Sequence, residues 1–350
     1  MNFWRTIFFL FCSTGFLIGQ TSNEVLTVQN INLDDIQRGS IQKFWLQLGS
    51  DAQNKPISIP ILVAKGNEPG PVLGLTAAIH GNELNGIAII QNTFKNLDAT
   101  KLKGTIIGIP GINPISIVNH KRKYIDNEDL NRNFPGKKEG NRSQQMAYQI
   151  NEKVLSHFDF HVDMHTASFG RVNSLYGRGD MTNDTLAIML KLQKPDIIVS
   201  NKGESSFGTS SGLTMRAAAL AQGIKSITVE YGDPQVYQPK MIERGEKGIE
   251  SLLKWLKMKT GSVGIPEIEN VCSKSYWLFT NQGGLLQIEV VLNQKVSKGQ
   301  RIATLKNPFG EVLEEYYAPE DGIVIGENTN PVNISGGRII HLGILRNPTK

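Results

Sequence analysis

Along the first two-thirds of the chain, short apolar runs alternate with stretches in which apolar residues recur every three or four positions. The runs ISIPILVAKG (57–66) and PVLGLTAAI (71–79) are β-rich and predict strands, whereas NELNGIAIIQNTFKNL (82–97) has the period of an amphipathic helix. The same pattern predicts strands at 104–112, 158–165, 195–200 and 226–232, and helices at 143–158 (opened by Ser143), 214–223 and 239–257. This alternation predicts an α/β domain over 24–262, built on one sheet with helices on both faces.

Residues 266–350 have a different pattern, in which short apolar runs are separated by Gly, Asn and Pro and almost no helical period remains. Such a pattern predicts a second, small all-β domain. The segment that joins the two domains, 259–266, is short, so we expect the domains to touch.

The first twenty residues consist of a short start carrying Arg5, an apolar run over 7–18, and a small and polar ending. This is the pattern of a signal peptide, and the run is shorter than the roughly 20 residues of a membrane-spanning helix. We therefore expect residues 1–20 to be removed and the protein to be periplasmic or secreted. A membrane anchor formed by an uncleaved N-terminal segment is the alternative.

Only two cysteines occur in the chain. Cys12 lies in the N-terminal apolar run. The residues directly before it are bulky, which disfavours attachment of a lipid to this cysteine. Cys272 then has no partner for an internal disulfide, and a lone cysteine of this kind is far more often a small buried residue than a nucleophile.

Composition and charge narrow the class of partner. With 39% hydrophobic and 20% charged residues the chain can bury a core, and a net charge of +5 is small for 350 residues. Nucleic acid is therefore not an expected partner, and no stable membrane partner is expected either. The one dense basic run, HKRKY (120–124), precedes an acidic stretch and is either a solvated loop or part of an active-site loop.

Three residues have the chemistry and the expected placement of a zinc site. In AAIHGNE, His80 ends an apolar strand and Glu83 begins the next helix, with Gly81 allowing a tight turn, so both side chains can face one point. A catalytic zinc takes three protein ligands of this kind and leaves a fourth position for water. The third ligand is expected at His165, where another apolar strand ends.

His161 competes with His165 for this role. It lies on the same face of the strand but about 13 Å back along it, which favours a structural role. Asp163 shares that face and could orient His165, although a strand-end aspartate that binds backbone is equally ordinary.

A polar loop and a further strand end supply groups for binding and catalysis. The string DNEDLNRNFPG carries Asn131 and Arg132, whose planar fork suits a carboxylate. The alternative is a loop arginine paired with Asp126 or Asp129. Glu230 ends the strand SITVEYG, where it could accept the proton of a zinc-activated water and pass it to a leaving amine; the alternative is a salt bridge at a sheet edge.

These motifs resemble those of the succinylglutamate desuccinylase and aspartoacylase family, which is related to the zinc carboxypeptidases. The likeness rests on HGNE (80–83), NP (113–114), DLNRNFPG (129–136), DMHTAS (163–168) and TVEYG (228–232), in that order, and covers most of residues 55–260. It implies a mixed-sheet, three-layer α/β/α fold like that of the zinc carboxypeptidases.

The resemblance also implies a role for each candidate residue: one Zn²⁺ per chain on His80, Glu83 and His165, substrate-carboxylate binding by Asn131 and Arg132, and general acid/base catalysis by Glu230. One position departs from the family pattern, because the arginine that usually polarises the scissile carbonyl is replaced here by Tyr124. Arg122 or Lys123 could take over that role. Arg122 is favoured because a guanidinium can donate two aligned hydrogen bonds to a developing oxyanion.

The C-terminal segment resembles the β domain of many members of the family, a barrel-sandwich fold of the lipoyl carrier type. The phrases GGLLQIEVVLNQKVSKGQRIATLKNPFGE and APEDGIV carry this likeness. A carrier would present a modified lysine at a hairpin tip, often beside Met, but the tip here reads LKNPFGE. We therefore expect no attached cofactor, an ordinary role for Lys306, and a function in shielding the site or in assembly as a homo-oligomer.

The sequence thus predicts an exported zinc-dependent amide hydrolase that acts on a small carboxylate-bearing substrate such as an N-acyl amino acid. A metallocarboxypeptidase that acts on peptide C-termini would use the same chemistry with a different pocket. A non-catalytic exported ligand-binding protein is the second alternative, and Glu230 argues against it because binding alone needs no base.

Overall fold

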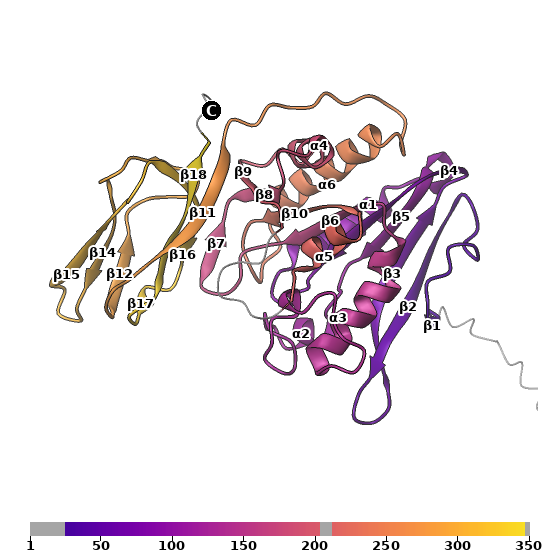
Figure 1. The fold of residues 1–350 in the computed structure, drawn as a ribbon, viewed down its shortest axis with the longest axis horizontal. Helices are drawn as coiled ribbons and strands as arrows, with labels where there is room; N and C mark the ends of the chain where they lie inside the picture. Colours follow the sequence, from indigo (N-terminus) through magenta and orange to yellow (C-terminus); the bar gives the residue numbers. More distant parts are fainter. Residues whose placement is uncertain (1–24, 204–211, 347–350) are drawn as a thin grey trace, which may run out of the picture.

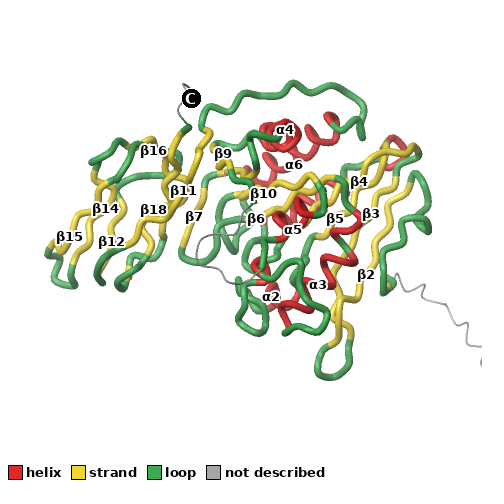
Figure 2. Tube along the Cα trace, in the orientation of Figure 1, coloured by secondary structure: helices red, strands yellow, loops and turns green. Residues whose placement is uncertain are grey.

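The computed structural model describes residues 25–203 and 212–346, so the expected signal peptide over 1–20 lies outside the described residues. The fold is a mixed α/β structure in which one long sheet runs through the molecule (Figure 1). Helices cover the sheet at one end, whereas the C-terminal end consists of strands and loops (Figure 2). None of the helices in the described ranges is long and apolar enough to cross a membrane.

The long sheet is mixed, with parallel strands at its centre and both parallel and antiparallel pairs on either side. Its strands follow the order β1 (Thr27–Val28), β2 (Ser40–Ser50), β3 (Pro56–Lys65), β5 (Lys103–Ile109), β4 (Glu68–Ala77), β6 (Phe160–His165), β10 (Lys225–Tyr231), β8 (Leu175–Gly179), β9 (Ile197–Ser200), β11 (Val271–Phe279), β18 (Arg338–Leu345), β16 (Gly322–Asn328) and β13 (Lys295–Val296), and β7 (Arg171–Asn173) pairs with β16 off this path. The central strands β5, β4, β6 and β10 are parallel to one another. Their carboxyl ends therefore meet at one edge, where α/β sheets bind ligands.

Helices pack on both faces of the sheet. One face carries α1 (Asn85–Lys95), α4 (Asp184–Leu192) and α6 (Pro239–Trp255), whose apolar sides join one buried cluster. The other face carries α2 (Pro114–Val118), α3 (Arg142–Lys153) and α5 (Met215–Ala221), which contribute to a second cluster. Three short 3-10 helices complete this part, at Ala99–Lys101 (η1), Leu130–Arg132 (η2) and Leu155–His157 (η3). The sheet between two helix layers agrees with the expected α/β arrangement.

The start of α3 differs from the expectation. The capping residue is Asn141, whose side chain accepts from the backbone N–H of Gln144 while the Gln144 side chain accepts from that of Asn141. Ser143 lies inside the first turn, and its hydroxyl donates to Asp126. The capping-box pattern explains the shift, since Asn is as good a cap as Ser and Gln at the third helical position completes the pair.

Strands β2 and β8 and helix α4 are not among the predicted elements. β8 has the sequence LYGRG, five residues with two glycines, which weakens any strand signal. Its place in the sheet depends on tertiary pairing with β10 and β9, which local sequence does not encode.

The C-terminal part forms strands in two sheets. β15 (Val312–Tyr317), β14 (Arg301–Lys306), β12 (Gly284–Ile288) and β17 (Val332–Asn333) form a separate four-stranded sheet, whereas β11, β18, β16 and β13 extend the long sheet. β11 joins the two parts because it pairs with β9 in parallel. Cys272 in β11 is a buried free thiol, and Lys306 ends β14 with its ammonium 3.1 Å from Gln287 Oε1. The C-terminal strands are thus continuous with the sheet that carries the candidate site.

Candidate active site

His80 and Glu83 lie in the loop between β4 and α1. β4 ends at Ala77 and α1 begins at Asn85, so the expectations that His80 ends the strand and that Glu83 begins the helix are wrong by three and two residues. The intervening turn is closed by a hydrogen bond from the backbone N–H of Glu83 to the carbonyl of His80. Gly81 is required by close approach, because a Cβ there would lie 1.9 Å from the carbonyl carbon of Ser116.

His165 and Glu230 are neighbours at the carboxyl ends of two parallel strands. His165 ends β6, and its register partner on β10 is Glu230. Side chains at equal positions on adjacent parallel strands lie side by side on one face. The topology therefore brings the third candidate ligand and the candidate acid/base to the edge of the sheet where the His80 loop begins.

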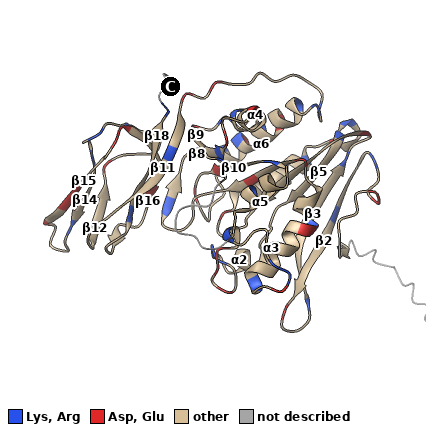
Figure 3. Cartoon of the chain, in the orientation of Figure 1, with Lys and Arg blue, Asp and Glu red and all other residues tan. Residues whose placement is uncertain are grey.

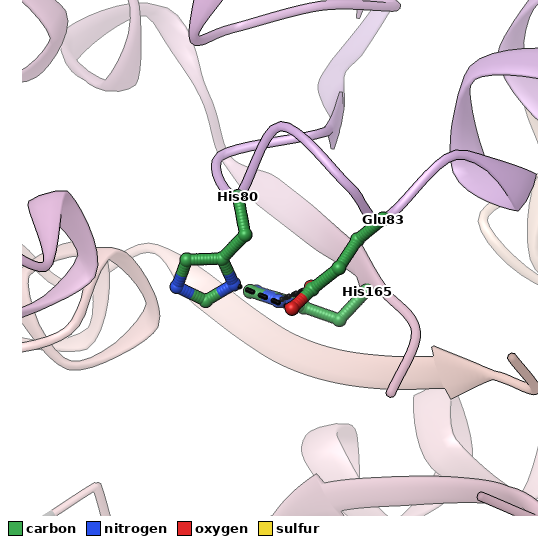
Figure 4. A group of neighbouring side chains, drawn as sticks. All are labelled: His80, Glu83 and His165. Carbon is green, nitrogen blue, oxygen red and sulfur yellow. Dashed lines mark hydrogen bonds and ion pairs between the residues drawn. The ribbon is translucent and has the colours of Figure 1, made fainter. Parts of the chain in front are cut away.

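The three candidate ligands meet at one point (Figure 4). His80 Nδ1 lies 2.8 Å from Glu83 Oε1, and His165 Nδ1 lies 2.8 Å from Glu83 Oε2. All three side chains are buried, with at most 4% of any residue exposed. The ligand atoms lie within 4.8 Å of one another.

A carboxylate holds the far side of each imidazole. His80 Nε2 donates to Asp129 Oδ1 at 3.0 Å, and His165 Nε2 donates to Asp163 Oδ2 at 2.9 Å. With the proton on Nε2, each Nδ1 presents its lone pair toward Glu83. His80 Nδ1 is buried and makes no hydrogen bond among the described residues, although a carboxylate oxygen lies 2.8 Å away.

Two imidazole lone pairs facing a buried carboxylate suit a cation bound to all three. The set of two histidines and one glutamate has the composition of a catalytic zinc site with an open fourth position. Carboxylates behind both histidines fix the tautomer and the orientation of the rings, as partners of zinc-binding histidines do. The residues present therefore fit zinc.

Asp163 lies where the strand parity places it, whereas Asp129 has a contact that was not predicted. Asp129 precedes Asn131 by two residues, and its side chain also accepts from the backbone N–H of Asn131. Burial alone would raise the pKa of Asp129, but its hydrogen bond with His80 and the nearby positive charges hold the pKa well below the ordinary value. A charged Asp129 is thus available to hold His80.

His161 is not among the ligands. It is buried in β6, where its Nδ1 lies 2.8 Å from the Ser226 hydroxyl and its Nε2 lies 2.9 Å from the Thr76 hydroxyl. Thr76 also donates to Asp163 Oδ1 at 3.0 Å, which links His161 to the carboxylate behind His165. Burial lowers the pKa of His161 to about 4, so it is a neutral member of a buried hydrogen-bond network.

Arg122 is the member of the basic run that enters the site. It donates to Glu83 Oε1 at 3.1 Å and to Asp129 Oδ2 at 2.8 Å. Tyr124 is buried in the core beside the loop, and Lys123 is exposed; neither lines the pocket. Of the alternatives raised for carbonyl polarisation, the structure brings Arg122 to the candidate ligands and leaves Lys123 outside.

Asn131 and Arg132 lie in η2, on the same side of the site. The Asn131 side-chain oxygen accepts from the backbone N–H of Met215 at 2.7 Å, and its amide nitrogen is the group that can donate to a ligand. Its Nδ2 lies 3.5 Å from His165 Nε2. Arg132 donates to the Asn131 carbonyl at 2.7 Å and forms no ion pair with Asp126 or Asp129 within the described residues, which leaves donors free in the pocket.

Glu230 accepts a hydrogen bond from Asn173 Nδ2 at 3.3 Å. Burial is the largest influence on its carboxyl and raises the pKa above the ordinary value, with a further rise from Glu83. Nearby His165 and Arg178 oppose the rise. A carboxyl whose pKa lies above the ordinary glutamate value is better able to carry a proton between reaction steps.

The three candidate ligands line one pocket of about 920 Å³ together with Arg122, Asp129, Asn131, Arg132 and Glu230. Its charged lining within the described residues consists of six arginines (Arg122, Arg132, Arg171, Arg178, Arg216 and Arg338) and three carboxylates (Glu83, Asp129 and Glu230). The C-terminal strands contribute Trp277 and His341 as well as Arg338. Sequence reasoning did not identify Arg171, Arg178, Arg216 or the C-terminal residues, because only the tertiary fold brings these strands and helix α5 to the candidate ligands.

Comparison with known proteins identifies the family. The sequence model of the succinylglutamate desuccinylase/aspartoacylase catalytic domain matches residues 69–256. The chain belongs to this family. A relative, the N-alpha-acetyl-L-2,4-diaminobutyric acid deacetylase of Halomonas elongata, is 23% identical over 331 residues, which cover 92% of this chain and 95% of that protein.

Several solved structures share the fold. The product-bound ectoine utilization protein EutE (DoeB) from Ruegeria pomeroyi superposes with a TM-score of 0.78 at 22% identity, covering 88% of this chain and 96% of the other. A succinylglutamate desuccinylase/aspartoacylase from Rhodobacter sphaeroides gives a TM-score of 0.79 at 21% identity, with coverage of 91% and 99%. The similarity extends beyond the catalytic domain into the C-terminal strands, since both alignments cover nearly the whole chain.

Proposed function

We propose that this protein is a zinc-dependent deacylase that hydrolyses the amide bond of an N-acyl amino acid or a related small carboxylate-bearing substrate, releasing a carboxylate and a free amine. The observation that carries this proposal is the placement of Glu230 beside His165, in the same pocket as the three candidate ligands. A metal-binding protein without catalysis has no need of a buried carboxyl next to its ligands.

His80, Glu83 and His165 would hold one Zn²⁺ per chain. When bound there, zinc acidifies water and polarises a carbonyl as a Lewis acid. Asp129 and Asp163 keep both imidazoles in the tautomer that binds metal.

The chain's own residues then orient the substrate and move the proton. Arg132 and the amide of Asn131 bind the substrate carboxylate, which fixes the scissile bond over the ligands. Glu230 takes a proton from the attacking water and returns it to the leaving nitrogen, so the amine departs neutral. Arg122 donates to the oxygen that becomes negative as water adds to the carbonyl.

The named relatives support the deacylase form of this chemistry. The Halomonas elongata protein is a deacetylase of an N-acetylated amino acid, and the matching family model is named for a desuccinylase and an aspartoacylase. A metallocarboxypeptidase would need a pocket that accepts a peptide on the acyl side. We propose the deacylase because the Halomonas elongata relative and the matching family model are named for enzymes that act on small acylated amino acids.

The test is turnover of two panels by the purified, zinc-loaded protein. One panel holds amino acids acylated with acetyl, succinyl and longer groups, and the other holds short peptides with free C-termini. Release of amine from the first panel alone supports the proposal. Release from peptides alone would establish a carboxypeptidase, and inertness toward both panels would favour a binding protein.

We also propose that the protein works outside the cytoplasm and that its C-terminal part, over 266–350, is a barrel-sandwich domain of the lipoyl type without an attached cofactor. The apolar run over 7–18 supports export, and the contribution of C-terminal strands to the pocket supports a shielding role. N-terminal sequencing of the exported form tests the first point, since removal of about twenty residues is expected.

A further inference from the structure

Asp163 is a charged residue buried in the sheet next to the candidate metal site. Charged residues occur in both parts of the molecule (Figure 3), but among the Lys, Arg, Asp and Glu residues that the structure describes, only Glu83, Asp163 and Arg216 are buried. An exposed charge such as that of Arg301, which lies in β14 outside the pocket lining, is hydrated. A buried carboxylate is stable only where its oxygens are hydrogen-bonded. His165 binds one oxygen of Asp163, so the partner of the other oxygen matters for how firmly Asp163 is held.

A row of hydrogen bonds continues from that second oxygen across three parallel strands. Thr76 on β4 is the register partner of Asp163 and donates to its Oδ1 at 3.0 Å. Thr76 Oγ1 lies 2.9 Å from Nε2 of His161, and Nδ1 of His161 lies 2.8 Å from the hydroxyl of Ser226, its register partner on β10. The side chains of Thr76, His161 and Ser226 are fully buried. The row therefore runs from β10 through β6 and β4 to the carboxylate that holds His165, away from solvent.

The direction of each hydrogen bond in this row follows from the carboxylate at its end. An ionised Asp163 can only accept, so the single hydroxyl proton of Thr76 is committed to Asp163 Oδ1. Thr76 Oγ1 is then the acceptor for His161, which places the His161 proton on Nε2. Nδ1 of His161 is left as an acceptor, and Ser226 donates to it. This assignment needs a neutral His161, and burial lowers the pKa of His161 to about 4.

The ring of His161 is also oriented by packing. Phe158 stacks on it, with ring centroids 5.5 Å apart and planes 30° apart. Gly74, the register partner of His161 on β4, leaves the space for Phe158, because a Cβ at Gly74 would lie 2.3 Å from the Phe158 ring. The stacking fixes the plane in which the two nitrogens of His161 point toward Thr76 and Ser226.

Stability alone does not account for polar groups at these positions. Thr76 interrupts the apolar run LGLTAAI that begins in β4, and Ser226 lies in the β-rich run KSITVEY of β10. A buried hydrogen-bonded pair contributes little more to folding than two apolar side chains of the same shape would. The feature that the polar row adds is a fixed contact with Asp163, the residue behind a candidate zinc ligand.

We propose that Thr76, His161 and Ser226 are positioning residues for the zinc site, which hold Asp163 so that it keeps the proton of His165 on Nε2 and leaves the Nδ1 lone pair for the metal. This inference rests on the proposed function, because it requires zinc at the three candidate ligands. Loss of the Thr76 hydroxyl leaves Asp163 Oδ1 unpaired in the core, which favours a carboxylate turned away from His165. Zinc affinity then falls, as it does when other partners of metal-binding histidines are removed.

The experiment measures the zinc affinity of the full-length protein by competition with a chromogenic chelator. Thr76→Val keeps the shape of the side chain and removes its hydroxyl, whereas Thr76→Ser keeps the hydroxyl and loses a methyl group. Thr105→Val is the matched control. Thr105 is a buried threonine of β5, the strand beside β4, and its side chain makes no hydrogen bond within residues 25–203 and 212–346.

Thr76→Val should weaken zinc binding by about tenfold, the low end of the range for residues that support a metal ligand, whereas Thr76→Ser and Thr105→Val should stay within about twofold of the wild type. Wild-type affinity in Thr76→Val, or an equal loss in Thr76→Ser, overturns the inference. Where Thr76→Val does not fold, Ser226→Ala decides: it removes the last donor of the row and should weaken binding by about threefold, and wild-type affinity there overturns the inference. These changes weaken zinc binding without abolishing it, because the three candidate ligands stay in place.

A double-mutant cycle with Asp163→Ala separates positioning from a merely structural role. Because Thr76 is proposed to act through Asp163, Thr76→Val should cause no further loss of zinc affinity once the Asp163 carboxylate is removed. A loss of the same size in both backgrounds would show that Thr76 acts on the fold as a whole, and would overturn the inference.

Zinc affinity also separates this inference from the deacylase proposal, because metal binding needs no turnover. Zinc affinity that depends on the Thr76 hydroxyl, in a protein that hydrolyses neither substrate panel, would uphold the positioning row and refute the deacylase. Turnover of acylated amino acids together with wild-type zinc affinity in Thr76→Val would uphold the deacylase and refute the positioning row.

Discussion

Asp129 accepts a hydrogen bond from Nε2 of His80 at 3.0 Å and, through its other oxygen, binds Arg122. One partly buried carboxylate thereby orients a candidate zinc ligand and holds Arg122, the arginine that we propose polarises the scissile carbonyl. Both functions depend on Asp129, a loop residue that is not itself a candidate metal ligand.

Asp129→Asn should weaken zinc binding by about 10- to 100-fold, because the imidazole of His80 loses the charged acceptor that fixes its tautomer. Competition with a chromogenic chelator measures the affinity. Asp126→Asn is the matched control, since Asp126 lies in the same loop but binds Ser143 at the start of α3. Equal zinc affinity in the Asp129 variant and the wild type would show that Asp129 does not stabilise zinc binding.

Glu230→Gln should keep the fold and the zinc but lose about 10²- to 10⁴-fold in kcat, the range for loss of a general acid/base. Gln has nearly the same shape, so the hydrogen bond from Asn173 is the main contact to change. Turnover and zinc content are measured on the same preparation. Wild-type turnover in this variant would assign the base to another group.

The pH dependence of kcat/KM should reflect the raised pKa of Glu230. The base must be ionised, so activity falls as pH drops through this pKa, and burial places that limb above the ordinary glutamate range. Arg178 opposes the rise, so Arg178→Gln should move the acid limb to higher pH. Arg301→Gln should leave the limb in place, and a limb that moves to lower pH in Arg178→Gln would contradict the assignment.

The losses in kcat/KM from changing Arg132 and from changing the substrate carboxylate should not be additive. Arg132→Ala, or a methyl ester in place of the carboxylate, should each cost about 2–5 kcal/mol in kcat/KM, since either change leaves a buried charge unpaired. The double change should cost little more than either alone. A double cycle on kcat/KM with acid and ester substrates measures the coupling, and additive losses would return Arg132 to a structural role in the loop.

The parts of the site that lie at strand ends could be predicted from the sequence. His165 and Glu230 each end an apolar run, and parallel neighbours in an α/β sheet present their ends at one edge, so their proximity follows from pattern and topology rules alone. His80 and Glu83 were found by the same reasoning, although the turn continues two residues further than expected before α1 begins.

The pocket wall could not be predicted in this way. Trp277 and Arg338 lie far along the chain from the candidate ligands and reach the pocket only because β11 pairs with β9 and β18 pairs with β11. The change in pattern after residue 264 indicates an all-β segment, but alternation along a strand does not say which sheet the strand joins. The hydrogen bond between Asp129 and His80 was missed for a related reason, since it depends on the path of a loop.

The central claim is that His80, Glu83 and His165 bind zinc, and elemental analysis of the purified protein tests it most directly. The wild type should contain about one zinc per chain, and His80→Ala and His165→Ala should lose it while keeping their secondary structure by circular dichroism, because the sheet does not depend on a catalytic metal. His161→Ala alters a buried histidine of β6, the strand that ends at His165, and this variant should retain the metal. Full zinc content in His80→Ala and His165→Ala would contradict the account.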